Sequence, residues 1–282
     1  MEASLRSAAF GDGVPPPKPF GVPASPRGRL LAAIVLGGRG RYAAAATLLN
    51  DLRASKDPVL ASLAASTLAS HRRQLGGHAA ALTLDGEALA LAITAPREEP
   101  DPDGLDAEGA RADALLGLAA DNLGRGRLAA ARRLVARAEA HTGNWRSRTR
   151  AGWVGAEIEL ASNISEAGIA PAEMALETAR ARGACRHVVK SQLVLGVTIA
   201  NGSSAERDRA KALVESARET ADKYEFNSLL WVACLVAADF AAGHADEYRF
   251  RVPELLHAVL RHADPCGRRL ARESPWVPAE GV

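Results

Sequence analysis

Residues 115–138 read LLGLAADNLGRGRLAAARRLVARA, and this stretch predicts two helices joined by a tight turn. Gly126 lies at the turn, where a glycine adopts backbone conformations that other residues avoid. Apolar residues at helical spacing flank the turn on both sides. They are Leu115, Leu118 and Ala119 before the glycine, and Ala131, Val135 and Ala138 after it. Because alanine has a high helix propensity and a small side chain, the two helices can pack closely.

The same helix–turn–helix organisation recurs along the chain. Gly40 and Gly77 are 37 residues apart, Gly77 and Gly126 are 49 apart, and Gly202 and Gly243 mark later breaks. The predicted hairpins cover 28–37 with 41–55, 58–75 with 78–94, 107–124 with 127–141, 144–162 with 170–183, 185–200 with 204–223, and 227–242 with 245–263. Repeated helical hairpins bury their apolar faces against their neighbours, so the pattern predicts a stacked, all-α array.

Residues 115–138 resemble a tetratricopeptide repeat (TPR), a helix–turn–helix unit of about 34 residues. Two further hairpins share parts of that pattern, through Ala33, Leu36, Gly40, Tyr42, Ala45 and Leu49, and through Leu195, Gly196, Ala210, Val214 and Ala217. The resemblance implies an all-α, right-handed superhelix, or α-solenoid, of about six hairpins. It also implies that the first helix of each hairpin lines a concave groove that holds a ligand.

Composition predicts how the chain is divided. Residues 1–26 are rich in proline and glycine and predict a disordered tail, in which Pro15–Pro17 can also form a polyproline segment. Residues 27–264 form the predicted TPR-like repeat domain. Within it, residues 95–106 (APREEPDPDGLD) predict an irregular, acidic and solvated linker. Residues 265–282 predict an irregular C-terminal tail.

Charge and cysteine content narrow the class of protein. A formal net charge of +2 over 282 residues argues against a general nucleic-acid or membrane-surface binder. The three cysteines lie far apart, which suits a reducing compartment better than a disulfide framework. No apolar run in the sequence has the length of a membrane span or the form of a signal peptide. We therefore expect a cytoplasmic protein without a membrane partner.

The sequence contains none of the catalytic motifs HExxH, GxSxG, CxxC or GxxxxGK[ST]. His257, His262 and Cys266 do not share a helix face, so we expect surface histidines there and not a metal site. Asp101 and Asp103 lie in a segment that lacks the register of an EF-hand calcium loop. These observations predict a non-enzymatic protein that uses no cofactor and no metal.

Arginine is concentrated between residues 125 and 150. The stretch contains Arg125, Arg127, Arg132, Arg133, Arg137, Arg146, Arg148 and Arg150. Guanidinium groups bind carboxylates and phosphates, and the nearby Trp145 and Trp153 can stack on a ligand. Three interpretations stay open. They are a solvated face paired with acidic residues such as Glu139 or Glu157, a site for an acidic protein or peptide, and a site for RNA or DNA.

The implied groove narrows the choice of partner-binding residues. Arg150, Trp153 and Glu157 lie at i, i+3 and i+7, so they share one face of the first helix in the fourth hairpin. Core packing is the alternative interpretation of Trp153. Further candidates lie near this helix or on other first helices, namely Arg146, Arg72, Arg73, Lys190 and Asn201.

These observations predict a non-enzymatic scaffold or adaptor that binds a segment of a partner protein in the groove. The partner is another protein or peptide, and the arginine-rich stretch favours an acidic one over nucleic acid. The alternative is a regulatory module, of the kind found in bacterial transcriptional regulators, that acts through a second protein or nucleic acid. An enzyme is the least favoured class, because its reacting groups must converge in one pocket.

Overall fold

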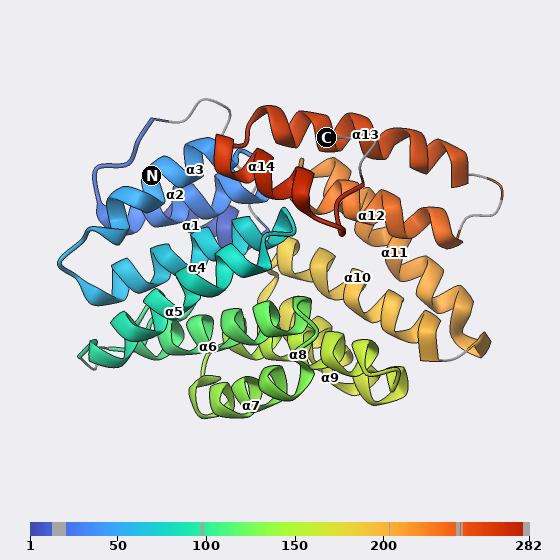
Figure 1. Cartoon of the computed structure of the whole chain (residues 1–282), viewed down its shortest axis with the longest axis horizontal. Coiled ribbons are helices and arrows are strands. Elements are labelled where there is room, and N and C mark those ends of the chain that lie inside the picture. The colour runs from blue at the N-terminus through green and yellow to red at the C-terminus, as the bar shows by residue number, and fades with distance from the viewer. Residues whose placement is uncertain (13–20, 97–98, 203, 241–242, 244, 279–282) are drawn as a thin grey trace.

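The computed structural model describes residues 1–12, 21–96, 99–202, 204–240, 243 and 245–278. Every regular element in these residues is a helix, so the predicted all-α class is confirmed (Figure 1). The α-helices of the described residues are α1 (Glu2–Phe10), α2 (Pro26–Gly38), α3 (Tyr42–Arg53), α4 (Pro58–Gln74), α5 (His78–Thr94), α6 (Ala107–Gly124), α7 (Leu128–Ala138), α8 (Trp145–Ala161), α9 (Ser165–Arg182), α10 (Cys185–Gly202), α11 (Arg207–Lys223), α12 (Asn227–Phe240), α13 (Ala245–Arg261) and α14 (Pro265–Glu273). Short 3-10 turns follow α7 and α10, at Glu139–His141 and Ser204–Glu206.

Capping residues explain where several helices begin. Asp57 accepts hydrogen bonds from the backbone N–H groups of Val59 and Leu60 and so caps α4. Pro58 occupies the first turn of that helix, where a missing N–H leaves no helical hydrogen bond unmade. Asp106 caps α6 in the same way. The helix start predicted at residue 58 is confirmed.

Left-handed glycines form the turns inside the first three predicted hairpins. Gly40 and Gly126 have φ of +71° and +72°, a conformation that a side chain disfavours. In the second predicted hairpin the left-handed residue is Gly76, and the neighbouring Gly77 instead precedes α5 as its N-cap. The predicted turn at Gly76 and Gly77 is therefore present, and the positive φ that favours glycine falls on Gly76.

Consecutive helices pack against one another along the chain, α4 on α5, α6 on α7, α8 on α9 and α10 on α11 among them. The helix limits follow the predicted hairpins closely except at α9, which begins at Ser165 where a loop to residue 170 was predicted. Pro171 lies inside α9. A Cβ on Gly152 of α8 would lie 2.5 Å from the carbonyl oxygen of Pro171. Close packing of α8 on α9 thus supports a helix that runs through the proline, against its local preference.

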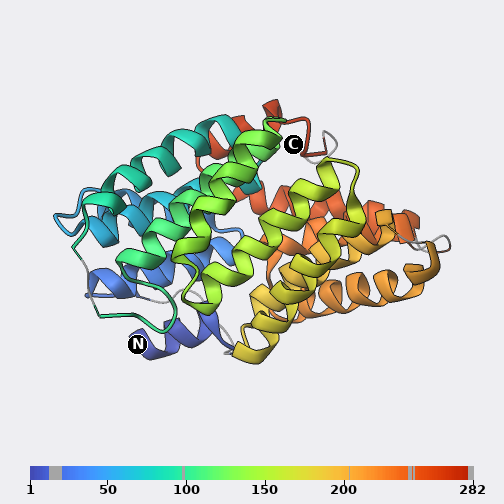
Figure 2. The same ribbon diagram turned by 90° about the horizontal axis from the view of Figure 1, so that it is seen from below.

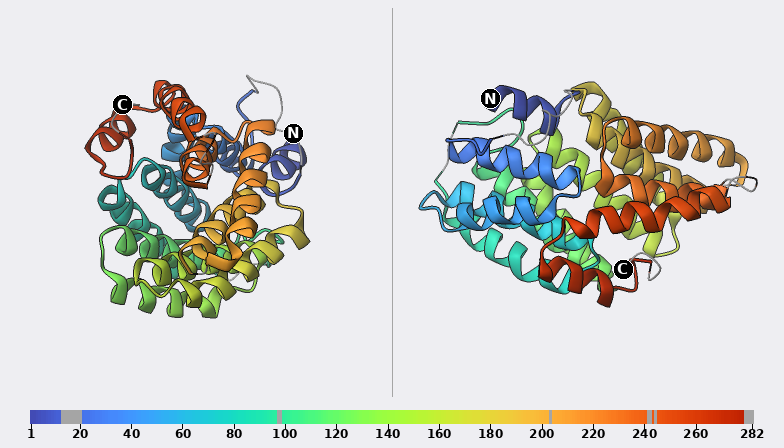
Figure 3. Two further views of the ribbon diagram at one scale, coloured as in Figure 1. Left: turned by 90° about the vertical axis from the view of Figure 1, so that its right-hand side faces the viewer. Right: turned by 90° about the horizontal axis from the view of Figure 1, so that it is seen from above.

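The two ends of the helical array lie against each other. The backbone N–H of Ala43 on α3 donates to the carbonyl oxygen of His262, after α13, at 2.7 Å. Arg72 on α4 donates from Nη2 to Oδ2 of Asp264, just before α14, at 2.6 Å. The left view of Figure 3 shows the helices following one another around the molecule until α13 and α14 lie beside the first helices. Tyr42, at 1% exposure, belongs to the apolar cluster of α12 and α13.

Both predicted tails contain a helix that packs on distant parts of the chain. Helix α1 packs on α2 and lies beside the start of α10 (Figure 2). It buries Leu5, Ala8, Ala9 and Phe10. Helix α14 covers the turn between α4 and α5, where a Cβ on Gly77 would lie 2.7 Å from Cδ1 of Leu270. The predicted disorder of 1–26 and irregularity of 265–282 are therefore wrong for these two helices. The predicted polyproline segment Pro15–Pro17 lies outside the described residues.

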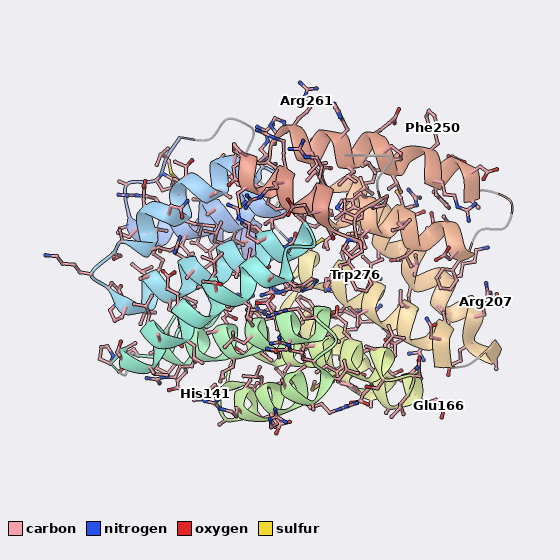
Figure 4. The ribbon with its side chains drawn as sticks, in the orientation of Figure 1. His141, Glu166, Arg207, Phe250, Arg261 and Trp276 are labelled. Atoms are coloured by element: carbon pink, nitrogen blue, oxygen red, sulfur yellow. The ribbon has the colours of Figure 1, made fainter. Side chains whose placement is uncertain are left out.

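Alanine and leucine form most of the buried core. One apolar cluster joins α1 to α2, α3 and α4, and a second joins α10 through α14 with Tyr42 and Leu75. Large apolar side chains on the surface are scattered, as Phe250 and Trp276 show at 72% and 63% exposure (Figure 4). None of the described helices combines the length and the apolar character that crossing a bilayer requires.

Candidate functional site: an inner charged face

Charged residues of α4, α5 and α6 form the first part of the candidate site. Arg73 on α4 donates from Nε to Oδ1 of Asp121 on α6 at 2.7 Å, and from Nη2 to Asp85 on α5. Both carboxylates have 0% side-chain exposure, whereas Arg73 keeps 14%. Gly117 makes room for Asp85, because a Cβ there would lie 2.2 Å from Oδ2 of that aspartate. Burial raises the pKa of Asp85, which Arg73 opposes and Asp121 reinforces.

Asp113 on α6 holds two arginines of α8. Arg146 donates from Nη1 to Oδ2 of Asp113 at 2.5 Å, and Arg150 donates to Oδ1 of the same carboxylate. Arg146 also donates to the carbonyl oxygens of Asp103 and Gly104, at 2.8 and 2.9 Å. Several hydrogen-bond acceptors around a buried guanidinium offset the cost of removing it from water. Arg146 therefore joins α8 to the loop before α6, while Arg150 keeps more contact with solvent.

Side chains of α8 and α10 continue the site. Lys190 on α10 donates from Nζ to Oε1 of Glu157 at 2.7 Å, and its ammonium lies 5.7 Å from the ring centroid of Trp153. Trp153 donates from Nε1 to Oγ of Ser191 at 2.8 Å and stacks on His187, with centroids 5.5 Å apart. Trp153 thus packs between α8 and α10 and also contacts the charged groups.

Electrostatic interactions link these groups across five helices, α4, α5, α6, α8 and α10. Although burial opposes its charge, the pKa of Arg73 is raised, because Asp85, Asp121 and Glu157 stabilise the cation. We define the inner charged face as Arg73, Asp113, Asp121, Arg150, Glu157 and Lys190. Side-chain exposure rises from 0% for Asp121 to 30% for Glu157 and 33% for Lys190. Glu157 and Lys190 are therefore the most solvent-accessible side chains of this face.

Hydrogen bonds, ion pairs and ring contacts connect the predicted partner-binding residues in this region, with two exceptions. Arg72 forms a bidentate pair with Asp264, at 2.8 and 2.6 Å, and holds the start of α14 on α4. Asn201, at the end of α10, is exposed and donates to the carbonyl oxygen of Val197 at 2.8 Å. The cations of the inner charged face were predicted as site residues, but the aspartates that hold them were not. Asp113, Gly117 and Asp121 lie at i, i+4 and i+8 on α6, and that spacing was the available signal.

The acidic loop before α6 is folded around buried carboxylates. Asp103, at 0% exposure, accepts at Oδ1 from Nε1 of Trp145 (2.9 Å) and from Arg182 (3.0 Å), and at Oδ2 from Arg6 (2.7 Å). Arg6 also donates to both carboxylate oxygens of Asp101, at 3.1 and 2.9 Å. The prediction of a solvated linker is therefore wrong at these positions. Arginines from distant helices neutralise the aspartates, and no metal-ligand cluster occurs among the described residues.

The arginine-rich stretch divides into two groups. Arg146 and Arg150 face inward onto Asp113, as described above. Arg132, on the outward side of α7, pairs with Glu159, with Nε and Oε1 3.1 Å apart. The remaining five arginines are exposed and form no ion pair within the part of the chain that the structure describes. They are Arg125, Arg127, Arg133, Arg137 and Arg148.

His187 packs among aromatic rings beside the inner charged face. Its ring lies 4.8 Å from Trp145 and 5.5 Å from Trp153, measured between centroids. Burial, reinforced by the charges of Arg186, Arg146 and Arg150, lowers the pKa of His187 well below its usual value, so the ring is neutral. Burial also raises the pKa of the nearby Cys185 thiol. Both side chains are therefore uncharged at neutral pH.

No protein-family model matches this chain, and no curated protein matches its sequence. The likeness of residues 115–138 to a tetratricopeptide repeat therefore rests on those residues themselves.

Proposed function

We propose that this chain is a right-handed TPR-like superhelix of about six hairpins that acts as a non-enzymatic adaptor and holds a segment of a partner protein. The consecutive packing of helices from α2 to α13 supports the architecture. Charged side chains from α4, α6, α8 and α10 converge on the inner charged face. This convergence is the observation that supports the adaptor role. One bound segment can touch several helices there at once, which is how helical-repeat proteins hold peptides.

The exposure of the charged groups favours an acidic partner segment. Lys190, Arg150 and Arg73 keep 33%, 17% and 14% of their side chains exposed. Asp121 is fully buried and Asp113 is 5% exposed, so Glu157, at 30%, is the one well-exposed anion of this face against three partly exposed cations. Carboxylates on a partner can therefore complete the coordination of these cations.

A charge swap tests this role without removing the ion pair. In the double variant Glu157→Lys with Lys190→Glu, the same two positions carry opposite charges and the net charge is unchanged. With the full chain as bait in an extract of the source cells, we expect the wild type to capture a specific partner and the swap to capture at least about tenfold less. The matched control swaps Arg53 and Glu87, a pair with N and O 2.6 Å apart on α3 and α5. Equal capture by wild type and by the Glu157/Lys190 swap would contradict the proposal.

The outward arginines of α7 favour a second candidate, a regulatory module that acts through a partner or nucleic acid. Arg133 and Arg137 lie one turn apart on the exposed side of α7, near Arg125 and Arg127 at the preceding turn. An electrophoretic shift assay at low and at physiological salt separates the candidates. Binding that survives physiological salt and is lost in Arg133→Glu with Arg137→Glu supports the regulatory module.

A further inference from the structure

Helix α1 is a short helix that packs on a surface formed by other parts of the chain, including α2 and α10. It has nine residues, and its N-cap, Met1, supplies no side-chain hydrogen bond. Isolated helices of this length are marginal in water, so the helical form of α1 depends on the surface that it covers. It buries Leu5, Ala8, Ala9 and Phe10, with Leu5 at 1% and Phe10 at 3% exposure, whereas Ala3 in its first turn is exposed. Figure 2 and the right view of Figure 3 both place α1 at the margin of the molecule, beside the start of α10.

The polar part of the surface under α1 is built without α1. Oδ1 of Asp101 accepts from the backbone N–H groups of Asp103 (2.8 Å) and Leu105 (3.2 Å). The backbone N–H of Asp101 donates to Oδ2 of Asp106 at 2.7 Å. Trp145 and Arg182 fix the other side of Asp103. The two carboxylates that receive Arg6 are therefore held in place by their own loop and by α8 and α9.

The apolar part of that surface adjoins the inner charged face. The ring of Phe10 lies 6.3 Å from Trp145, edge to face, and 6.3 Å from His187. The guanidinium of Arg146 lies 5.6 Å from the Phe10 centroid. His187 stacks on Trp153, which contacts Lys190 of the inner charged face. A helix in the place of α1 thus contacts residues that are one side chain away from the proposed partner site.

We infer that the surface under α1 is a docking site for an amphipathic helix of a partner protein, and that α1 occupies it in cis. The partner helix carries an arginine followed four residues later by an aromatic residue, as Arg6 and Phe10 do. Its apolar residues lie at the positions of Leu5, Ala8 and Ala9. The arginine pairs with Asp101 and Asp103, and the aromatic ring packs on Trp145 and His187. This inference deepens the proposed adaptor function and rests on it.

An exchange experiment on the full chain tests the docking site. A protease site is inserted after Gly21, because Gly21 and Val22 are exposed, and a fluorophore is attached to the N-terminal amine. After cleavage, the labelled segment is displaced with synthetic peptides of residues 1–12, and release is followed by fluorescence anisotropy. Arg6→Gln and Phe10→Ala peptides should compete at least about tenfold less well than the natural peptide. A Ser4→Glu peptide, which makes the same charge change as Arg6→Gln at an exposed position, should compete within about twofold.

Two outcomes would overturn the inference. The first is a label that exchanges only when urea unfolds the chain, which makes α1 an integral part of the fold. The second is equal competition by the Arg6→Gln and Ser4→Glu peptides, which removes the arginine from recognition. Both are independent of the Glu157/Lys190 swap. If exchange follows Arg6 while the swap leaves partner capture unchanged, the inner charged face fails and the docking site stands. If the swap abolishes partner capture but α1 does not exchange, the docking site fails and the inner charged face stands.

Discussion

Asp103 is a buried charged residue that joins three distant parts of the chain. Trp145, Arg182 and Arg6 all donate to its fully buried carboxylate. Asp103→Asn keeps the shape but removes the charge and turns an NH2 group toward donors. We expect it to lower the free energy of unfolding by about 2–4 kcal/mol, measured by urea unfolding. The control is Glu87→Gln in the more exposed pair with Arg53, which should lose less than about 1 kcal/mol. Similar losses in the two variants would show that the Asp103 cluster is not a structural centre.

His71 on α4 predicts how stability depends on pH. Burial, with the charges of Arg186 and Arg72, lowers the pKa of His71 from 6.5 to about 3. Between about pH 6.5 and about pH 3 the unfolded chain binds a proton at this residue and the folded chain does not. The free energy of unfolding therefore falls as the pH decreases through this range. The slope from one such histidine reaches about 1.4 kcal/mol per pH unit.

Urea unfolding from about pH 7.5 to about pH 5 measures this slope. His71→Gln should show a smaller loss of stability on acidification than the wild type, whatever its stability at neutral pH. His257→Gln, at an exposed position on α13, is the control and should keep the slope of the wild type. A His71→Gln variant that loses stability as steeply as the wild type would rule out this origin of the pH dependence.

Single residues of the site were predictable from one helix, but their pairing was not. The spacing of Arg150, Trp153 and Glu157 indicates a shared face of α8, and all three do contact neighbouring helices. Their partners Asp113, Ser191 and Lys190 lie 37, 38 and 33 residues away in sequence. Local periodicity carries no information on such distant groups, so cations held by buried aspartates looked available for a ligand.

At the scale of the element, Asp264 has two separable roles at the start of α14. Its Oδ1 accepts from the backbone N–H of Gly267 at 2.7 Å, and both oxygens accept from Arg72. Asparagine caps a helix as well as aspartate does, so Asp264→Asn removes mainly the ion pair, whereas Asp264→Ala removes both interactions. We expect Asp264→Ala to cost about 1 kcal/mol more than Asp264→Asn in urea unfolding. Equal costs would mean that the cap contributes nothing to holding α14.

The helices that the sequence analysis missed differ in how visible they were. Helix α14 begins with Asp264 and Pro265, the same signal as Asp57 and Pro58 at α4, and was therefore predictable. Helix α1 has no such start signal, and a long proline-rich stretch follows it. Its apolar residues are buried only by packing against α2, α8 and α10. The sequence pattern alone could therefore not distinguish this helix from a tail.

At the scale of the whole molecule, the contact between the two ends predicts that they open together. Units at the ends of an open repeat array fray because each touches one neighbour. Here Val259 on α13 lies against the turn before α3, where a Cβ on Gly40 would meet its Cγ2 at 2.8 Å. Val259→Ala should therefore speed amide hydrogen exchange in α3 as well as in α13. Hydrogen-exchange mass spectrometry measures both helices in one sample.

The control for this prediction is Val154→Ala on α8, a valine that is also buried, at 6% exposure, but belongs to a separate apolar cluster of α6, α7 and α8. It should speed exchange in its own region and leave α3 as in the wild type. Unchanged exchange of α3 in Val259→Ala would mean that the ends touch without stabilising each other. The sequence could not predict this contact, because Arg72 and Asp264, which contribute to it, are 192 residues apart.

The same contact limits how this protein can change in length. An open array of helical hairpins gains or loses whole units by tandem duplication, because the new unit only has to fit its two neighbours. Here a duplicated hairpin between α3 and α13 would move Ala43 away from His262 and leave the buried Tyr42 uncovered. We therefore expect insertions to be tolerated in the outer turns and a duplicated hairpin between α3 and α13 to be destabilising.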